Sequence, residues 1–351
     1  MNYMGIDHHK QYSHMTLMDE KGNVLKAGRV MNLRSDVEEF LEGAGDEVEA
    51  VIEAGFSSYV MVDLLETLGV EVKIANPSDV KAIAKAKIKT DKRDSKILAH
   101  LLRTDLIPEV YRRSGENQRA QRVMRQRAFF VESLTRVKNR IHALIAKQSE
   151  EVLRDLDQIK DIFSKRGMEL LKQLELPSTD KQLLEALLKT YRHLEERIKE
   201  SNDLVKSLYK EMPEAQLIDT VPGFGPFLSV LVAIEIGDVG RFDSAGKLHS
   251  YAGVIPSTHS SGNRTYHGRL IKGGNRWLRW AAVEAVIPAT RKDFELRVFY
   301  EKRAKRKDAN VAKIATARRL LAIIYKILKE KRCYEPYKRE WKGKKKESAA
   351  L

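Results

Sequence analysis

The segment 116–210 constrains the fold of this chain most, because it carries helix signals and few strand signals. It contains a single proline, Pro177. Apolar residues recur at helical spacing from Val123 to Ile145, and again from Leu183 to Leu208. We predict two long amphipathic helices joined by an irregular middle. Such a pair is either a helical hairpin or coiled coil that links subunits, or a helical insert within one subunit.

The segments on either side of these helices have a different character. Residues 1–80 show antiparallel strand signals first and strand–helix units afterwards, which predicts a mixed sheet with helices on its faces. Residues 217–330 are mostly helical, with a tight turn and a glycine-rich stretch between helices. The predicted domains are residues 1–112 (α/β), 113–212 (helical), 213–342 (mainly α) and 343–351 (a basic tail).

The distribution of charge indicates a polyanionic partner. The chain has 64 Lys and Arg against 49 Asp and Glu, a net charge of +15. Residues 81–147 hold 18 basic and 6 acidic residues, and residues 291–346 hold 21 and 7. We interpret these two blocks as contact surfaces, because aligned Lys and Arg neutralise phosphates. The alternative is that both are solvated helix faces.

Composition excludes several classes of protein. Cys333 is the only cysteine, so a disulfide framework and a multi-cysteine zinc site are impossible. Hydrophobic residues make up 42% of the chain, enough to form a core. No apolar run reaches the roughly 18 residues of a membrane span, and the first seven residues lack the features of a signal peptide. We expect a cytoplasmic protein with no membrane partner.

Acidic residues at the ends of predicted elements indicate a metal site. Asp7 follows the first apolar strand, and Glu53 follows the strand 48–52. Asp91 and Asp94 are three residues apart on a predicted helix, which places them on one face. Carboxylates this close repel one another unless a cation such as Mg²⁺ or Mn²⁺ binds, and two such ions can bracket a phosphodiester under attack. Each carboxylate alone could instead be a cap, a surface group or half of an ion pair.

Two further motifs lie in the C-terminal part. The turn 221–226 is similar to a helix-hairpin-helix turn, in which Gly223 and Gly225 let backbone N–H groups approach a phosphate; a plain helical connection is the alternative. The stretch 259–279 places a serine before a glycine in a predicted loop, where an activated serine can be a nucleophile, although most such pairs are simple turns. The basic residues that could neutralise a phosphate there are Arg264, Arg269, Lys272, Arg276 and Arg279.

In their joint order, these motifs resemble the insertion-sequence-110 family of DEDD transposases, now described as bridge-RNA-guided recombinases. The resemblance covers nearly the whole chain. Its N-terminal part rests on Met4-Gly5-Ile6-Asp7, on Glu53 and on residues 89–95. Its C-terminal part rests on residues 221–226, 234–238, 241–242, 251–256, 261–262, 272–275, 300–303 and 334–336.

The resemblance implies a fold and a chemistry. It implies an α/β RNase H-like (RuvC-like) N-terminal domain, a helical coiled-coil middle and a mainly α C-terminal transposase domain with a helix-hairpin-helix element. It also implies that a serine becomes joined to a DNA 5′ phosphate; we assign this role to Ser261, with Ser260 as an open alternative. Ser95 stands where the family commonly has alanine, and we expect no effect on metal binding. The metal ligands that it implies, for Mg²⁺ or Mn²⁺, are Asp7, Glu53, Asp91 and Asp94.

The resemblance implies partners as well. A noncoding bridge RNA from the same mobile element would pair with donor and target DNA, so the protein would bind mostly through backbone and shape. The serine of one subunit would meet the metal cluster of another, which requires a dimer or tetramer. We expect a prokaryotic, nucleoid-associated protein. The alternatives are a hydrolytic RNase H-like nuclease or junction resolvase, and a nucleic-acid-binding protein without catalysis.

Overall fold

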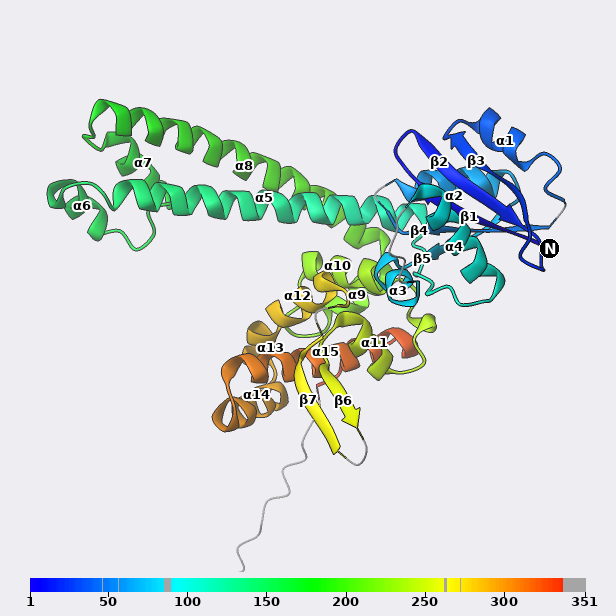
Figure 1. The fold of residues 1–351 in the computed structure, drawn as a ribbon. Helices are drawn as coiled ribbons and strands as arrows, with labels where there is room; N and C mark the ends of the chain where they lie inside the picture. Colours follow the sequence, from blue (N-terminus) through cyan, green and yellow to red (C-terminus); the bar gives the residue numbers. More distant parts are fainter. Residues whose placement is uncertain (46, 56, 85–89, 262–263, 272, 337–351) are drawn as a thin grey trace, which may run out of the picture. The chain divides into compact units, whose positions relative to one another are not determined.

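The chain divides into two compact units, Met1–Arg113 (unit 1) and Ser114–Leu351 (unit 2). A computed structural model describes residues 1–45, 47–55, 57–84, 90–261, 264–271 and 273–336 (Figure 1). Each unit has apolar cores of its own. The predicted fold class is confirmed at this level, because unit 1 is a mixed sheet with helices and unit 2 is mostly helical.

The sheet of unit 1 has the strand order β3-β2-β1-β4-β5. β2 is antiparallel to both β1 and β3, whereas β4 is parallel to both β1 and β5. The predicted order of antiparallel strands first and strand–helix units afterwards is therefore present. The strands are β1 (Asn2–His8), β2 (Tyr12–Met18), β3 (Val24–Met31), β4 (Val48–Glu53) and β5 (Glu71–Ala75).

Helices cover the two faces of this sheet. Because side chains alternate along a strand, Ile52 of β4 faces one core and Val51 faces the other. The first core includes residues of α1 and α2, and the second includes residues of α3 and α4. The helices are α1 (Arg34–Leu41), α2 (Ser58–Thr67), α3 (Pro77–Ile83) and α4 (Asp91–Arg103).

Gly5 allows α4 to pack unusually close to β1. A Cβ atom at Gly5 would lie 2.0 Å from the Ser95 carbonyl oxygen and 2.4 Å from the Ala99 amide nitrogen. Any larger residue would therefore push the helix away from the strand. Gly5 and Asp7 are two residues apart on β1 and share a face of the sheet. The close contact thus fixes α4 on the face to which Asp7 points.

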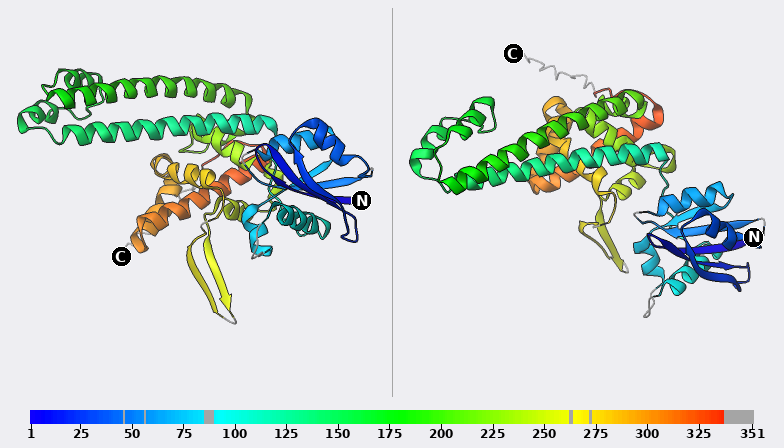
Figure 2. Two further views of the ribbon diagram at one scale, coloured as in Figure 1. Left: turned by 45° about the horizontal axis from the view of Figure 1, so that its top comes forward. Right: turned by 90° about the horizontal axis from the view of Figure 1, so that it is seen from above.

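Unit 2 begins with the two predicted long helices, α5 (Gly115–Ile145) and α8 (Ser178–Glu211). They lie side by side, and α6 (Glu150–Asp157) and α7 (Lys165–Gln173) connect them at one end (Figures 1 and 2). Apolar side chains of α5, α7 and α8 pack together near that end. The helices thus form an intramolecular hairpin, and a coiled coil between subunits stays a prediction.

The rest of unit 2 is a helical body around α10 (Pro226–Ile236). Every residue of α10 from Ser229 to Ile236 is buried. The other helices of the body are α9 (Pro213–Asp219), α11 (Ala245–Ala252), α12 (Arg276–Glu284), α13 (Val286–Lys292), α14 (Phe294–Arg306) and α15 (Ala309–Glu330), with a 3-10 turn at Val239–Arg241. Among the described residues, no helix combines the length and apolar character needed to cross a membrane.

The glycine-rich stretch is not the loop that the sequence predicted. The strands β6 (Pro256–Ser261) and β7 (Arg264–Leu270) form an antiparallel ribbon that projects from the helical body (Figure 1). The prediction was wrong because the strand sequences PSTHSS and RTYHGRL lack the apolar alternation that reveals a strand. On β7, for example, Tyr266 is 62% exposed and Leu270 is 37% exposed.

The predicted helix-hairpin-helix turn joins α9 to α10. Gly223 has a φ of +96°, and a Cβ there would lie 2.3 Å from the Ala285 carbonyl oxygen. Packing against the residue before α13 therefore requires glycine at this position. A Cβ at Gly225, in contrast, would meet nothing within 4 Å. Binding of phosphate by this turn stays a prediction.

Candidate metal site and serine ribbon

The parallel pairing of β1 and β4 brings Asp7 and Glu53 to the same edge of the sheet. Ile6 pairs with Ile52, and each acidic residue is the next one along its strand. Ile6 and Ile52 belong to the core under α1 and α2. By alternation, Asp7 and Glu53 face the opposite side, on which α4 packs. Both carboxylate residues are half-buried.

The start of α4 supplies the other two predicted carboxylates. Thr90 is the N-cap, and its hydroxyl accepts a hydrogen bond from the Arg93 amide at 3.3 Å. Asp91 and Asp94 both lie in the first turn. Negative side chains are favourable there, because the unpaired N–H groups of a helix start give it a partial positive charge. The sequence pattern T-D-K-R-D thus forms a capped helix end with two acidic side chains.

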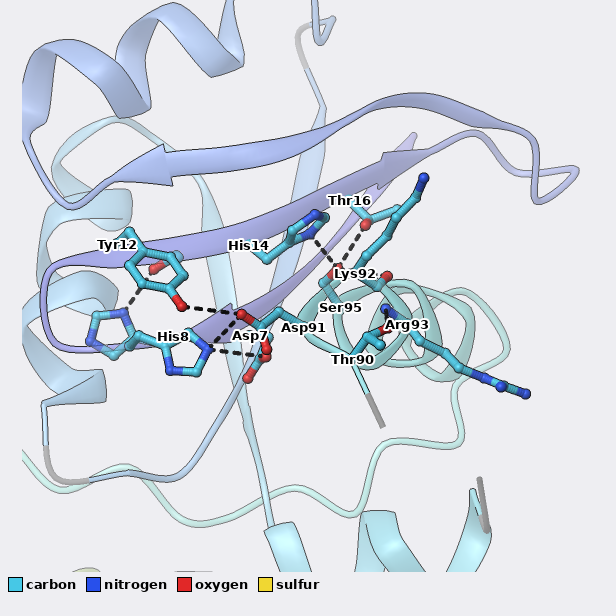
Figure 3. A network of polar contacts seen from close by, with 12 residues as sticks. Asp7, His8, Tyr12, His14, Thr16, Thr90, Asp91, Lys92, Arg93 and Ser95 are labelled. Carbon is cyan, nitrogen blue, oxygen red and sulfur yellow. Dashed lines mark hydrogen bonds and ion pairs between the residues drawn. The ribbon is translucent and has the colours of Figure 1, made fainter. Parts of the chain in front are cut away.

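Asp7 and Asp91 come together with a histidine. Asp7, His9 and Asp91 each offer a ligand atom, and these atoms lie within 4.8 Å of one another. His9 Nε2 is 3.4 Å from Asp7 Oδ2 and 3.2 Å from Asp91 Oδ2. The Tyr12 hydroxyl donates to Asp91 Oδ2 at 3.2 Å (Figure 3). Among the described residues, Glu53 and Asp94 are outside this closest group.

His9 is a site residue that the sequence analysis did not identify. The only signal for it is its spacing, because His9 is two residues after Asp7 and directly follows the end of β1. The neighbouring His8 has a different environment: its Nδ1 lies 2.9 Å from Ser13 Oγ and its Nε2 lies 3.0 Å from Ser57 Oγ. Burial lowers the pKa of His8. Of the adjacent pair, His9 is therefore the one placed against the carboxylates.

Ser95 links α4 to β2 one turn after Asp91. It is fully buried, and its hydroxyl lies 3.0 Å from His14 Nδ1 and 2.8 Å from Thr16 Oγ1 (Figure 3). Burial lowers the pKa of His14, while the nearby Asp91 and Asp7 act in the opposite direction. Alanine at position 95 would leave these two polar groups without this partner. Ser95 therefore helps to orient the helix that carries Asp91 and Asp94.

The donor atoms of the Asp7–His9–Asp91 group fit a divalent cation. Carboxylate oxygens are the usual ligands of Mg²⁺ and Mn²⁺. The imidazole nitrogen of His9 is also a ligand for transition metals, which makes Mn²⁺ compatible with the group. All three side chains are only partly buried, so solvent can reach the site. The arrangement suggests the use of a divalent metal and leaves the choice of ion open.

The ribbon of β6 and β7, called the serine ribbon from here on, carries the predicted serine nucleophile. Ser261 is the last residue of β6 and pairs with Arg264, while Ser260 pairs with Thr265. The structure describes the backbone at these positions and not the side chains. Gly262 and Lys272 lie outside the described residues. Arg269, near the end of β7, is exposed.

The two remaining predicted phosphate ligands of this region lie on α12. Arg276 is its first residue, and its guanidinium lies 5.5 Å from the centre of the Trp277 ring. Arg279 Nη1 lies 3.3 Å from the Gly253 carbonyl oxygen, and 3.4 Å and 3.5 Å from those of Ile271 and Gly273. Arg279 therefore connects the two ends of the ribbon, a structural role that sequence did not predict.

Comparison with known proteins gives two family models that match two separate parts of the chain. The DEDD transposase model of the IS110 type, described as "Transposase", matches residues 4–148. A second model, "Transposase IS116/IS110/IS902 family", matches residues 215–301. The first range includes the metal-site residues, and the second includes the ribbon.

Individual relatives carry related names. "Transposase for insertion sequence element IS1111A" of Coxiella burnetii is 23% identical over 94% of this chain and 90% of its own length. "Probable family 20 transposase" of Pseudomonas aeruginosa is 25% identical over 96% of this chain and 99% of its own. "Insertion element IS116 uncharacterized 44.8 kDa protein" of Streptomyces clavuligerus is 30% identical, over 41% of this chain and about a third (36%) of its own length.

Proposed function

Because the chain belongs to the IS110/IS116 family of transposases, we propose that it cuts and rejoins the DNA of a mobile insertion sequence through a covalent phosphoserine intermediate. The observation that carries this proposal is the convergence of Asp7, His9 and Asp91 where β1 meets the start of α4. Such a group is suited to phosphodiester chemistry, and the serine ribbon supplies a nucleophile in the other family-matched part of the chain.

Asp7 and Asp91 are the proposed direct ligands of the metal ion, and His9 is a third ligand. Glu53 and Asp94 are proposed to complete the site when DNA binds. A bound Mg²⁺ or Mn²⁺ would polarise the scissile phosphate and stabilise the charge that develops on it. The Tyr12 hydroxyl holds one Asp91 oxygen, and the Thr90 cap holds the helix end that carries Asp91.

The proposed nucleophile is the Ser261 hydroxyl, with Ser260 as the alternative. Its oxygen would form a bond to phosphorus while the bond from phosphorus to the DNA 3′ oxygen breaks. The serine proton is transferred overall to the released 3′ oxygen, and the 5′ phosphate stays on the serine. A 3′ hydroxyl from another strand then attacks this phosphoserine, which frees the serine and rejoins the DNA. No external energy source is needed, because one phosphodiester replaces another.

Several properties of the family extend the proposal to partners. A bridge RNA would select donor and target DNA by base pairing. A dimer or tetramer would bring the serine of one subunit to the carboxylates of another. The residues proposed to contact nucleic acid are Gly223, Gly225, Arg264, Arg269, Lys272, Arg276 and Arg279.

A hydrolytic nuclease or junction resolvase is the second candidate. It is favoured by one observation, namely that the Asp7–His9–Asp91 group lies entirely within unit 1, so that metal ions held there could activate water without a group from unit 2. With this chemistry, water would attack the phosphate and the DNA would not become attached to the protein.

Trapping on a nicked DNA substrate distinguishes these functions. We expect a covalent protein–DNA adduct that is lost in Ser261→Ala and kept in the matched control Ser260→Ala. The opposite pattern would move the nucleophile to Ser260. Cleavage with no adduct in the unmodified protein would support the nuclease instead. For the guide, we expect RNA to copurify and recombination to fall after RNase treatment; undiminished recombination would remove the guide and leave the recombinase.

A further inference from the structure

Glu235 is a buried carboxylate in unit 2 that the proposed chemistry does not use. It lies on α10 and is 1% exposed. A buried carboxylate is unfavourable unless donors satisfy its oxygens. Its Oε2 accepts a hydrogen bond from Asn275 Nδ2 at 2.7 Å, and its Oε1 accepts one from Gln121 Nε2 at 3.1 Å. Arg125 Nη2 lies 3.5 Å from the same Oε1.

Asn275 connects Glu235 to the point where the chain leaves the ribbon and enters α12. Its Oδ1 accepts from the amides of Trp277 and Leu278, at 3.0 Å and 3.1 Å, and so caps the helix. The backbone N–H of Asn275 donates to the Tyr251 carbonyl oxygen at 2.7 Å, and the side-chain Nδ2 of Asn275 lies 3.2 Å from the Tyr251 hydroxyl. The side chain bonded to Glu235 is therefore held by both α11 and α12.

The two ends of the ribbon are packed together beside Asn275. The Ile271 amide donates to the Ile255 carbonyl oxygen at 3.2 Å. A Cβ at Gly274 would lie 2.8 Å from the Gly253 amide nitrogen, so the two backbones are nearly in contact. Arg279 adds contacts to carbonyl oxygens on both ends. Residues 251–255 and 271–275, apart from Lys272, thus form one connected base for the ribbon.

On the other side, Glu235 contacts the long helix α5. Gln121 and Arg125 are four residues apart on α5 and so share a face of that helix. The Arg125 guanidinium also lies 5.5 Å from the Trp277 ring of α12. A single carboxylate therefore joins α5, α10 and the entry to α12.

We propose that Glu235 is a positioning residue that sets the direction of the serine ribbon relative to α5 and α10. The inference rests on the proposed function, because that function makes Ser261 of the ribbon the nucleophile. A two-stranded ribbon has little stability of its own, so its direction depends on its base. At about 3.3 Å per residue, β6 extends about 20 Å from that base. A small tilt of the ribbon therefore displaces Ser261, at the far end of β6, by several times as much as the residues at the base.

Exchanging the two polar partners tests this role. Asn275→Asp would place two carboxylates at the 2.7 Å contact between positions 275 and 235. Glu235→Gln would replace the carboxylate, which accepts from both Asn275 and Gln121, by an amide whose NH2 group can face one of these two donors. The double variant Glu235→Gln with Asn275→Asp restores the hydrogen bond in the reverse direction, with the side chain at position 235 as donor and the one at position 275 as acceptor. In it, the side-chain oxygen at position 235 still accepts from Gln121, and the carboxylate at position 275 still caps α12. Glu200→Gln, on the exposed side of α8, is the matched control.

Two measurements are needed on the full-length protein. Amide hydrogen exchange in residues 251–255 and 273–278 reports on the ribbon base, and the rate of adduct formation at saturating DNA reports on serine placement. We expect each single variant to speed exchange there by about tenfold and to slow adduct formation by about 100-fold, as expected for a displacement near 1 Å. DNA affinity should change little, and Glu200→Gln should match the unmodified protein.

The double variant decides the outcome even if a single variant folds poorly, because it keeps the shape and polarity of the pair. Recovery of both exchange protection and adduct rate supports the positioning role. Single variants with unchanged exchange, or a double variant as impaired as the singles, would overturn it. If the unmodified protein forms no adduct, the proposed function fails, and the exchange measurement still decides whether Glu235 holds the ribbon base.

Discussion

The candidate metal site and the serine ribbon are held in place by different means. Asp7 and Glu53 are fixed by the pairing of buried strands, and Asp91 and Asp94 by a helix that packs directly on Gly5. Ser261, in contrast, lies at the end of β6 in a two-stranded ribbon, and we propose that the base of the ribbon sets its direction. The carboxylates therefore depend on a packed core, whereas the serine depends on a few polar contacts around Asn275.

This difference has a consequence for the proposed chemistry. A site that holds cations needs fixed ligand positions, because repulsion between carboxylates would otherwise spread them apart. A nucleophile that acts on DNA must reach its substrate, which a projecting ribbon allows. The two regions should accordingly respond to substitution in different ways.

The largest effect is expected from Asp7→Asn or Asp91→Asn. Either change removes an anionic ligand at the centre of the metal group, so DNA cleavage should fall by about 10³-fold, the equivalent of about 4 kcal/mol. Binding of Mn²⁺, measured by electron paramagnetic resonance without DNA, should weaken in parallel. Asp36→Asn, on α1, is the control. Full activity and unchanged Mn²⁺ binding in either variant would disprove the metal site.

Gly5→Ala should show how strongly the metal site depends on packing. The added methyl would collide with the backbone of α4 at Ser95 and Ala99, and the free energy of unfolding of unit 1 should fall by about 3 kcal/mol. Gly28→Ala is a matched control, because a Cβ at Gly28 on β3 meets nothing within 4 Å. Urea denaturation, monitored by hydrogen exchange in α4, measures the free energy of unfolding of unit 1 in both variants. Equal midpoints for the two variants would show that the close approach is unimportant.

His9→Ala should weaken metal binding more moderately. It removes one neutral donor and leaves both carboxylates, so the affinity for Mn²⁺ should fall by about 10-fold to 100-fold. His193→Ala, at an exposed position of α8, is the control. Titration with Mn²⁺ in the absence of DNA measures the change. If His9→Ala binds Mn²⁺ as tightly as the control, His9 is a neighbour of the site and not a ligand.

The smallest effect concerns a polar contact in the helical body of unit 2. The Tyr334 hydroxyl donates to Asp293 Oδ2 at 2.6 Å, and the Tyr334 amide donates to Thr220 Oγ1 at 2.9 Å. Asp293 is 4% exposed. Tyr334→Phe should therefore lower the free energy of unfolding by about 1 kcal/mol at neutral pH.

The same variant has a predicted pH dependence. Burial, and then the hydrogen bond to Asp293, raise the pKa of Tyr334. The unfolded chain loses this proton near pH 10 while the folded chain keeps it, so the contribution is present below pH 10 and is lost as the pH rises. Tyr334→Phe should flatten the alkaline loss of stability in thermal unfolding between pH 9 and about pH 11. Tyr266→Phe, at a residue that is 62% exposed, is the control variant.

Much of unit 1 and of its site was predictable because the signals are local. Strand ends at Asp7 and Glu53, and the T-D-K-R-D start of α4, follow from residues close together in the sequence. The long helices α5 and α8 follow from apolar periodicity. His9 was missed because its approach to Asp91 depends on how α4 packs on β1. The phosphoserine step, the bridge RNA and the coiled coil between subunits come from the family resemblance alone and stay predictions.

The sequence by itself indicated the kind of elements, the candidate carboxylates and the family, since each depends on residue type and spacing along the chain. Only the tertiary structure decided that the serine stretch is a ribbon and that Glu235 bonds to Asn275, 40 residues away. The physical reason is that neither feature leaves a periodic pattern. The strands of the ribbon lack apolar alternation, and a buried polar pair is defined by the helices that bring its two members together.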